Sequence, residues 1–142
     1  MAASKIGAPP QWRRYEGLVL AADDFAGNAL RLAEWQTAER LAELDRPVDR
    51  TRWNTSPHIV NAFAGGLNDI VFPAAILQPP FFDEQADDAG NYGAIGAVIG
   101  HEITHHFDDR GRQFDADGNL ADWWTEADAA AYRARAERVV AL

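Results

Sequence analysis

The chain has 142 residues, of which 13 are Lys or Arg and 22 are Asp or Glu, and 47% of its residues are hydrophobic. This composition suits one globular domain, or a piece of one, and argues against a disordered or fibrous chain. The formal net charge of -9, without a basic cluster, argues against nucleic acid and anionic membranes as partners, and the absence of cysteine restricts a metal site to His, Asp and Glu ligands.

The first predicted element is a helix. Asp23 or Asp24 can cap it, and apolar side chains recur at helical spacing until about Leu44. The residues that follow, 46–57, are mostly turn formers and charged residues, which predicts a loop.

A β-hairpin is predicted next. Two β-prone runs, residues 59–63 and 69–72, flank a glycine-containing turn over residues 64–68. Pro73 limits how far the second strand can pair, because proline has no N–H to donate. The Pro-Pro-Phe-Phe segment at residues 79–82 is expected to be extended, because a residue before proline avoids the helical region.

Two further helices are predicted from their caps. Asp87 or Asp88 can begin a helix over residues 89–108. Thr125, with Asp128 three residues later, forms an acidic variant of the capping box and begins the final helix. Together the elements predict an α+β chain that is mainly helical, with one short hairpin.

The segment from His101 to His105 is a His-Glu-x-x-His motif inside a predicted helix. At 100° per residue the two histidines lie about 40° apart and one turn along the axis, so both imidazoles can reach one cation. Glu102 lies on the flank of that face, where its carboxylate can take a proton from a water on the metal. The His and Glu frequencies of the chain give roughly a 0.6% chance expectation for this motif, which makes coincidence a poor explanation.

The remaining residues of this helix fall on distinct faces. Asp108 follows His105 by three residues, so it is either a hydrogen-bonding partner of that imidazole or a solvated acid at the helix end. His106 projects away from the metal face and is interpreted as a surface or packing residue. The face opposite the motif is expected to be a core stripe of Ile95, Ile99, Ile103 and Phe107.

A zinc hydrolase needs a third protein ligand in addition to the two histidines. The metzincin pattern would place a histidine at position 111, where this chain has Gly111, so that class is excluded. In the glutamate-ligated class the ligand begins a Glu-x-x-x-Asp pattern, but the fourth residues after Glu126 and Glu137 are alanines. The third ligand is therefore not expected within this chain.

Four longer blocks are more distinctive than the motif: VNAF at 60–63, IVFPAAILQPPFFD at 70–83, NYGAIGAVIGHEITH at 91–105 and FDDRGRQFDADGNLADWW at 107–124. They resemble the neprilysin and endothelin-converting-enzyme family of zinc metalloendopeptidases. The resemblance implies a thermolysin-like zincin (gluzincin) catalytic domain. Residues 58–142 would be part of its core with the active-site helix, and residues 1–57 a helical segment leading into it.

The resemblance also implies roles for individual residues. His101 and His105 would bind one zinc ion, and Glu102 would be the base that activates water for hydrolysis of a peptide substrate. Asn61 and Ala62 would hydrogen-bond the backbone of an extended peptide. The apolar pocket for the side chain after the scissile bond would be lined by Ile76, Phe81 and Val98, for which ordinary core packing is the alternative.

Two positions depart from the family pattern, His106 in place of the usual glycine and Ala64 in place of the usual aromatic residue. The family's glutamate ligand and a histidine and arginine that stabilise the transition state would lie further along, and a large helical domain would precede. Two hypotheses follow. Either this chain is a segment of a zinc metalloendopeptidase, or, taken alone, it is a truncated, inactive zinc-binding or interaction fragment.

No membrane segment is expected in the chain. The first ten residues contain no apolar signal-peptide core, and the longest apolar run, residues 92–100, is shorter than the roughly 20 residues of a spanning helix.

Overall fold

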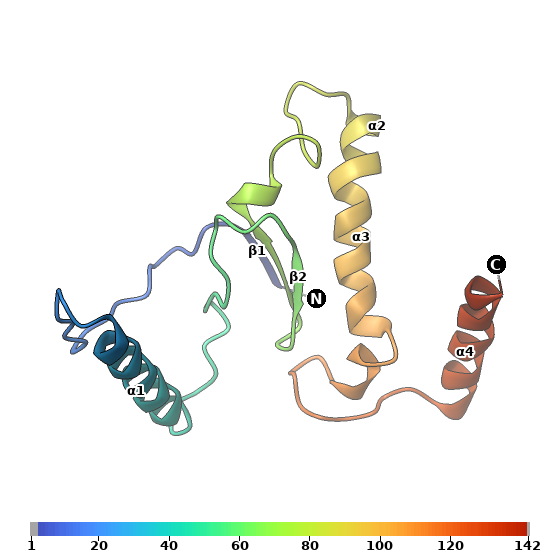
Figure 1. Ribbon diagram of the computed structural model, residues 1–142. Coiled ribbons are helices and arrows are strands. Elements are labelled where there is room, and N and C mark those ends of the chain that lie inside the picture. The colour runs from blue at the N-terminus through green and yellow to red at the C-terminus, as the bar shows by residue number, and fades with distance from the viewer. Residues whose placement is uncertain (1–2, 142) are drawn as a thin grey trace. The chain divides into compact units, whose positions relative to one another are not determined.

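The computed structural model describes residues 3–141 (Figure 1). They form two compact units, one joining the N-terminal strand to residues 54–141 and the other comprising Pro9–Trp53. Within residues 3–141, none of the helices combines the length and the apolar character needed to cross a bilayer. The boundary expected at residue 57 stays a prediction, although a strand inside the expected helical segment 1–57 was not foreseen.

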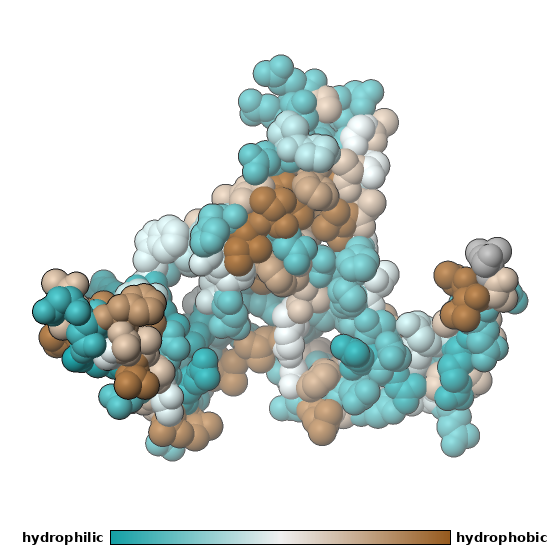
Figure 2. All heavy atoms as spheres, viewed as in Figure 1, coloured by the Kyte–Doolittle hydropathy of each residue, from teal (hydrophilic) through white to brown (hydrophobic). Residues whose placement is uncertain are grey.

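The unit Pro9–Trp53 is built around helix α1, Phe25–Glu43. Asp24 caps it by accepting a hydrogen bond from the Gly27 N–H at 2.9 Å, which confirms the predicted start. No residue of α1 is buried, and its apolar side chains, such as Phe25 at 90% exposure, lie at the surface (Figure 2).

The sheet belongs to the other unit and contains strands β1 (Ala3–Gly7), β2 (Phe63–Gly65) and β3 (Asp69–Pro73). Buried β3 lies in the middle, parallel to β1 and antiparallel to β2. The hairpin is confirmed, but the strand predicted over residues 59–63 is wrong. Asn68, at a φ of 56°, closes a tight turn that lets pairing extend to Gly65, so β2 lies nearer the turn.

The helix predicted over residues 89–108 is a succession of helical types. It begins with α2 (Asp88–Asn91), passes through a π-helical turn (Tyr92–Gly96), and continues as α3 (Ala97–Thr104). A 3-10 turn (His105–Phe107) ends it. The predicted cap is confirmed, because the Asp87 carboxylate accepts a hydrogen bond from the Gly90 N–H at 2.7 Å.

The segment before these helices is a turn and not the extended run predicted at residues 79–82. The Phe81 and Phe82 N–H groups both donate to the Gln78 carbonyl, at 3.0 and 3.1 Å, which folds the chain back on itself. The Pro79–Pro80 peptide bond is cis. The extended prediction rested on the preference of a residue before proline for extended backbone, and the turn forms in spite of that preference.

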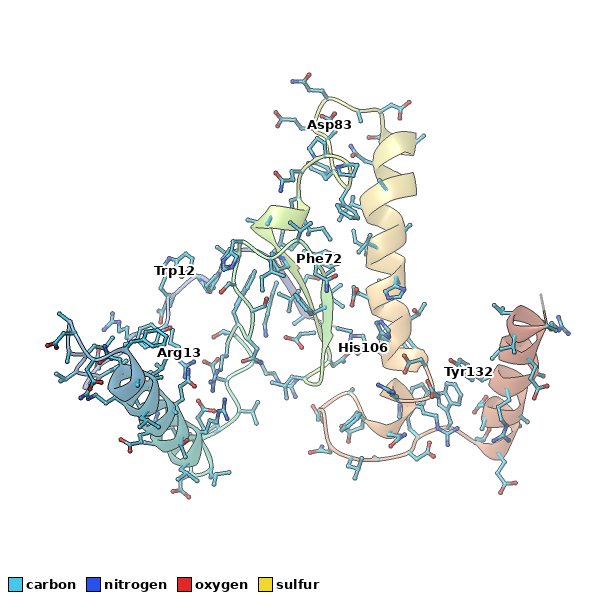
Figure 3. All side chains as sticks on the ribbon, in the orientation of Figure 1. Trp12, Arg13, Phe72, Asp83, His106 and Tyr132 are labelled. Carbon is cyan, nitrogen blue, oxygen red and sulfur yellow. The ribbon has the colours of Figure 1, made fainter. Side chains whose placement is uncertain are left out.

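The core of the larger unit lies between the sheet and α3, where Figure 3 places Phe72. The predicted stripe on α3 is wrong except at Ile95, because Ile99 is 36% exposed and Ile103 41%. The helix instead turns Ile95, Val98 and Glu102, at positions i, i+3 and i+7, toward buried surroundings. Buried Ala62, Ile70, Phe72, Ile76 and Ile95 form the centre, with Leu77, Phe81 and Val98 packed against it.

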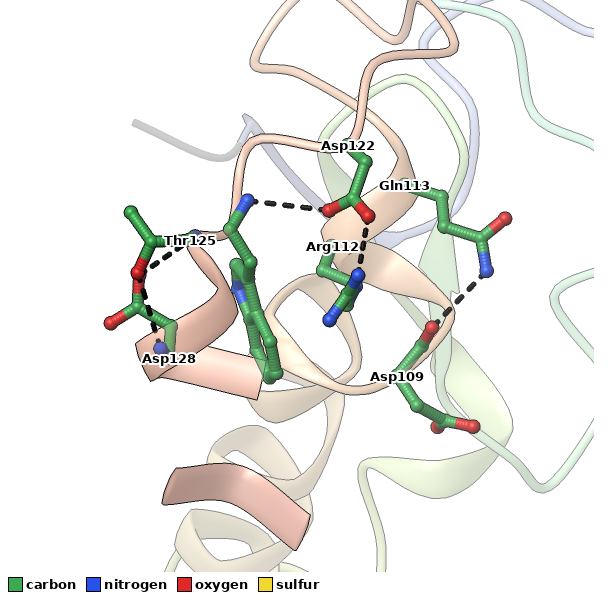
Figure 4. Close-up of polar contacts among 7 residues, drawn as sticks. Asp109, Arg112, Gln113, Asp122, Thr125 and Asp128 are labelled. Carbon is green, nitrogen blue, oxygen red and sulfur yellow. Dashed lines mark hydrogen bonds and ion pairs between the residues drawn. The ribbon is translucent and has the colours of Figure 1, made fainter. Parts of the chain in front are cut away.

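The final helix, α4 (Glu126–Val140), begins as predicted. The Asp128 N–H donates to the Thr125 hydroxyl oxygen at 3.2 Å, and the Asp128 carboxylate accepts from the Thr125 N–H at 3.0 Å (Figure 4). The Thr125 hydroxyl also donates to the Asp128 carboxylate at 2.7 Å, and this hydrogen bond, together with the one from the Thr125 N–H, holds the pKa of Asp128 below its ordinary value. In the segment that precedes the helix, the Arg112 guanidinium pairs with the Asp122 carboxylate. The central carbon of that guanidinium lies 5.0 Å from the centroid of the Trp124 ring.

Candidate active site

Two imidazoles converge at the end of α3. The Nε2 atoms of His101 and His105 lie 3.0 Å apart, and the ring planes are 86° from parallel. The helical repeat explains this arrangement, since residues four apart lie one turn above each other on the same face. Both side chains are exposed, so an ion can reach the two nitrogens from solvent.

The separation of these two nitrogens suits a zinc ion. Tetrahedral zinc with Zn–N bonds of 2.0–2.1 Å would hold two imidazole nitrogens roughly 3.3 Å apart, which a small rotation of either ring supplies. Across residues 3–141 no group of three or more His, Asp or Glu side chains is placed to hold a metal. The described residues therefore bring together two nitrogen donors at a spacing that one zinc ion can bridge.

Asp108 contacts the second of these histidines. Its Oδ2 lies 2.9 Å from Nδ1 of His105, while its Oδ1 accepts hydrogen bonds from the N–H groups of Arg110 and Gly111 at 2.9 and 2.8 Å. Burial alone would raise the pKa of Asp108, but the hydrogen bonds from Gly111, His105 and Arg110 outweigh burial and lower it. The ionised carboxylate only accepts hydrogen bonds, so the His105 proton sits on Nδ1 and leaves Nε2 free to bind a metal.

Glu102 is the buried acid of the motif, with 6% of its surface exposed. That small exposed part lines the same groove as the two imidazoles. Among the described residues, no hydrogen-bond donor contacts its carboxylate. A carboxylate without a partner on the wall of a groove is available to accept a hydrogen bond from a bound molecule.

The groove has a volume of about 630 Å³ and separates the edge of the sheet from the end of α3. Its sheet side consists of residues 61–66, which include the predicted Asn61 and Ala62, and its helix side holds the motif. The sequence did not single out several lining residues, because only the fold brings their loops to the groove. These are Asn68, Arg110, Phe114, Asp115 and Ala116.

Ile76, Phe81 and Val98 do not line this groove. Ile76 is 2% exposed within the core cluster, and Phe81 and Val98 pack against that cluster. Their role in a substrate pocket stays a prediction. His106 does line the groove, and among residues 3–141 its buried Nε2 has no hydrogen-bond partner.

Position 111 has no room for a side chain. A Cβ on Gly111 would overlap the carbonyl oxygen of His105 and the backbone of His106. The backbone observed here therefore cannot present a third histidine at position 111, where the metzincin pattern would have one.

The chain matches known peptidases along most of its length. The model of peptidase family M13 matches residues 61–142, more than half of the chain. An endothelin-converting enzyme homolog of Locusta migratoria is 43% identical over 90% of the chain. Human neprilysin is 45% identical over 83% of the chain, and the neutral endopeptidase of Lactococcus lactis is 41% identical over 90%.

Solved structures agree with this assignment. A zinc metalloprotease of Mycobacterium tuberculosis, crystallised with an inhibitor, is 54% identical over 95% of the chain with a TM-score of 0.86. PepO from Lactobacillus rhamnosis is 40% identical over 94%, with a TM-score of 0.84. The chain spans 18%, 16% and 21% of the three curated relatives and 21% and 22% of the two structures. This chain belongs to peptidase family M13, whose members are zinc metalloendopeptidases.

Proposed function

We propose that the chain supplies part of the active site of a zinc metalloendopeptidase with a thermolysin-like zincin core. The observation that carries the proposal is the convergence of two Nε2 atoms at 3.0 Å beside a buried carboxylate on one groove wall. A relative named neprilysin, another named neutral endopeptidase and a structure titled zinc metalloprotease support it.

In the proposed mechanism, His101 and His105 hold zinc through their Nε2 atoms. Zinc, when bound, supplies Lewis-acid polarisation of the scissile carbonyl and lowers the pKa of water to about 7. Glu102 takes the proton of the attacking water on a carboxylate oxygen and passes it to the leaving amine. Asp108 keeps the His105 proton on Nδ1, so that Nε2 stays available as a ligand.

The peptide would lie along the sheet side of the groove. Strand β2 is at the edge of the sheet, and residues 61–66 line the groove opposite the motif. An extended peptide can add to such an edge through backbone hydrogen bonds. Asn61 and Ala62 are the proposed hydrogen-bond partners of the peptide backbone. These hydrogen bonds would align the scissile peptide bond with Glu102.

A specific observation favours the alternative for the chain taken alone. No third donor for a metal is present among residues 3–141, so the two histidines leave the ion weakly held. We therefore propose that catalysis needs a third ligand from outside these residues, and that the 142 residues by themselves are an inactive zinc-binding or interaction fragment.

One experiment separates the two. Zinc titration and a peptide-cleavage assay are carried out on the 142-residue chain and on the protein as its gene encodes it. We expect weak zinc binding without turnover for the chain, and chelator-sensitive cleavage for the encoded protein. Cleavage that survives chelation would contradict zinc peptidase function, and chelator-sensitive cleavage by the 142 residues alone would refute the fragment hypothesis.

A further inference from the structure

A buried ion pair joins the two chain segments of the larger unit. Lys5 on β1 pairs through its Nζ with Oδ2 of Asp69 on β3, although the two residues are 64 positions apart in the sequence. The side chains are only 10% and 9% exposed. A charge pair withdrawn from water to this degree fixes the position of both partners, because either charge left alone would be strongly destabilised.

The second carboxylate oxygen of Asp69 faces the other neighbouring strand. Asp69 is the register partner of Gly65 on β2, and a Cβ on Gly65 would overlap Asp69 Oδ1. The carboxylate therefore packs directly on the glycine backbone. A free side chain would give way to an added methyl group, but this carboxylate is held from the opposite side by Lys5.

One carboxylate thus links β1 to β2, which are the two outer strands of the sheet. Gly65 and the residues beside it form the sheet wall of the groove, opposite Glu102. We propose that Lys5 and Asp69 are positioning residues that set the place of the β2 edge relative to the motif, and so the alignment of a bound peptide. This inference rests on the proposed peptidase function.

The kinetic test compares substrates on the protein as its gene encodes it. For Lys5→Met we expect KM to rise about tenfold for an extended peptide that reaches β2, with kcat within about twofold, because a shift of the edge weakens binding by about that factor. A truncated peptide that does not reach β2 should keep its KM. Lys5→Arg, which restores the cation, should return KM to the wild-type value. Arg14→Met, which breaks an 84% and 80% exposed pair with Glu16, is the charge-matched control and should change neither constant.

A second measurement does not depend on turnover. In Lys5→Met, hydrogen exchange of the amides of residues 63–66 should accelerate, whereas exchange in α4 should not change. Asp69→Glu keeps the ion pair but pushes a longer side chain against Gly65, so it should accelerate the same amides without loss of the folded state. Gly93→Ala is the control, because a Cβ there meets no atom within 4 Å and the residue lies outside the groove, so exchange at residues 63–66 should not change.

The outcomes are distinct for the two proposals. If the wild-type protein cleaves no peptide, the proposed peptidase function is contradicted. The hydrogen-exchange data still test whether Lys5 and Asp69 position strand β2, because they do not depend on turnover. Unchanged exchange at residues 63–66 in Asp69→Glu would overturn the positioning role. A fall in kcat with unchanged KM in Lys5→Met would also overturn it, since that result indicates only a loss of folded protein. Equal KM changes for the extended and the truncated peptide would overturn it as well, because the effect would not then depend on contact with β2.

Discussion

Asp108 lies against the side of His105 that faces away from His101, with its Oδ2 2.9 Å from Nδ1 of the ring. The two ring nitrogens of His105 therefore have separate partners, a carboxylate at Nδ1 and the second imidazole at Nε2. The chain turns sharply after the helix, and the N–H groups of Arg110 and Gly111 anchor the other carboxylate oxygen. His105 is consequently held in one tautomer and one orientation.

Removing this carboxylate should weaken zinc binding. For Asp108→Ala we expect zinc affinity to fall about 10- to 100-fold, because a ligand histidine without its hydrogen-bond acceptor is less basic and less well oriented. Competition with a chromophoric chelator measures the affinity. Asp109→Ala removes an adjacent exposed acid and should bind zinc as the wild type does. Equal affinities for the two variants would show that Asp108 is a solvated acid.

Neutralising Glu102 should separate binding from catalysis. In Glu102→Gln of the encoded protein we expect zinc affinity within about threefold of wild type and a loss of roughly 100- to 10,000-fold in kcat, since the amide cannot take a proton. Zinc titration and peptide cleavage give the two values. Glu137→Gln changes an exposed acid on α4 and serves as the control. A Glu102→Gln protein that retains turnover would rule out the assigned role.

An added methyl group should have opposite effects at two glycines near the motif. Gly111→Ala should lower the free energy of unfolding by about 1–3 kcal/mol, because its Cβ overlaps the backbone of His105 and His106. Gly100→Ala, inside α3, meets no atom within 4 Å and should raise that free energy by up to about 1 kcal/mol. Urea unfolding measures both. A neutral Gly111→Ala would mean that the turn after α3 is looser than described.

The start of α4 should depend on pH. Hydrogen bonds from Thr125 lower the pKa of Asp128 below its ordinary value of 3.8, so the ionised carboxylate stabilises the folded helix above pH 3.8. That contribution is lost as pH falls through the lowered pKa. Protection of the amides in the first turn of α4, measured relative to their intrinsic exchange rates at each pH, should therefore stay constant from neutral pH to about pH 5 and fall below pH 3.8, whereas Asp128→Asn should show no such fall. Identical profiles for the two proteins would contradict the capping role.

The features that depend on residues three or four positions apart could be predicted from the sequence. The caps at Asp24, Asp87 and Thr125 were predicted because each hydrogen bond spans only three residues. The facing imidazoles follow in the same way from the helical repeat. These features depend on a few neighbouring residues and not on the rest of the chain.

Long-range pairing was not readable. Strand β1 forms only because β3, more than sixty residues later, offers a parallel partner, and no pattern within residues 3–7 announces this. The side of α3 that faces the core was misjudged for the same reason. Helical periodicity groups Ile95 with Ile99 and Ile103, but the position of the sheet decides that Val98 and Glu102 turn inward.

The candidate site shows both situations. The motif and Asp108 were found from spacing, because they share one helix and the turn after it. The wall formed by Asn68 and Asp115 was missed, since the hairpin turn and the later loop meet only in the folded chain, where Asn68 donates to the Ala116 carbonyl at 3.4 Å.

Because the two imidazoles are four residues apart, on α3 and the 3-10 turn that continues it, the local half of the proposed cation site assembles as soon as this helical segment forms. Tight retention of zinc would then indicate that a further segment has joined the site, since residues 3–141 offer no third donor beside the two imidazoles. Tight zinc binding and peptidase activity would then both depend on separate stretches of polypeptide being brought together.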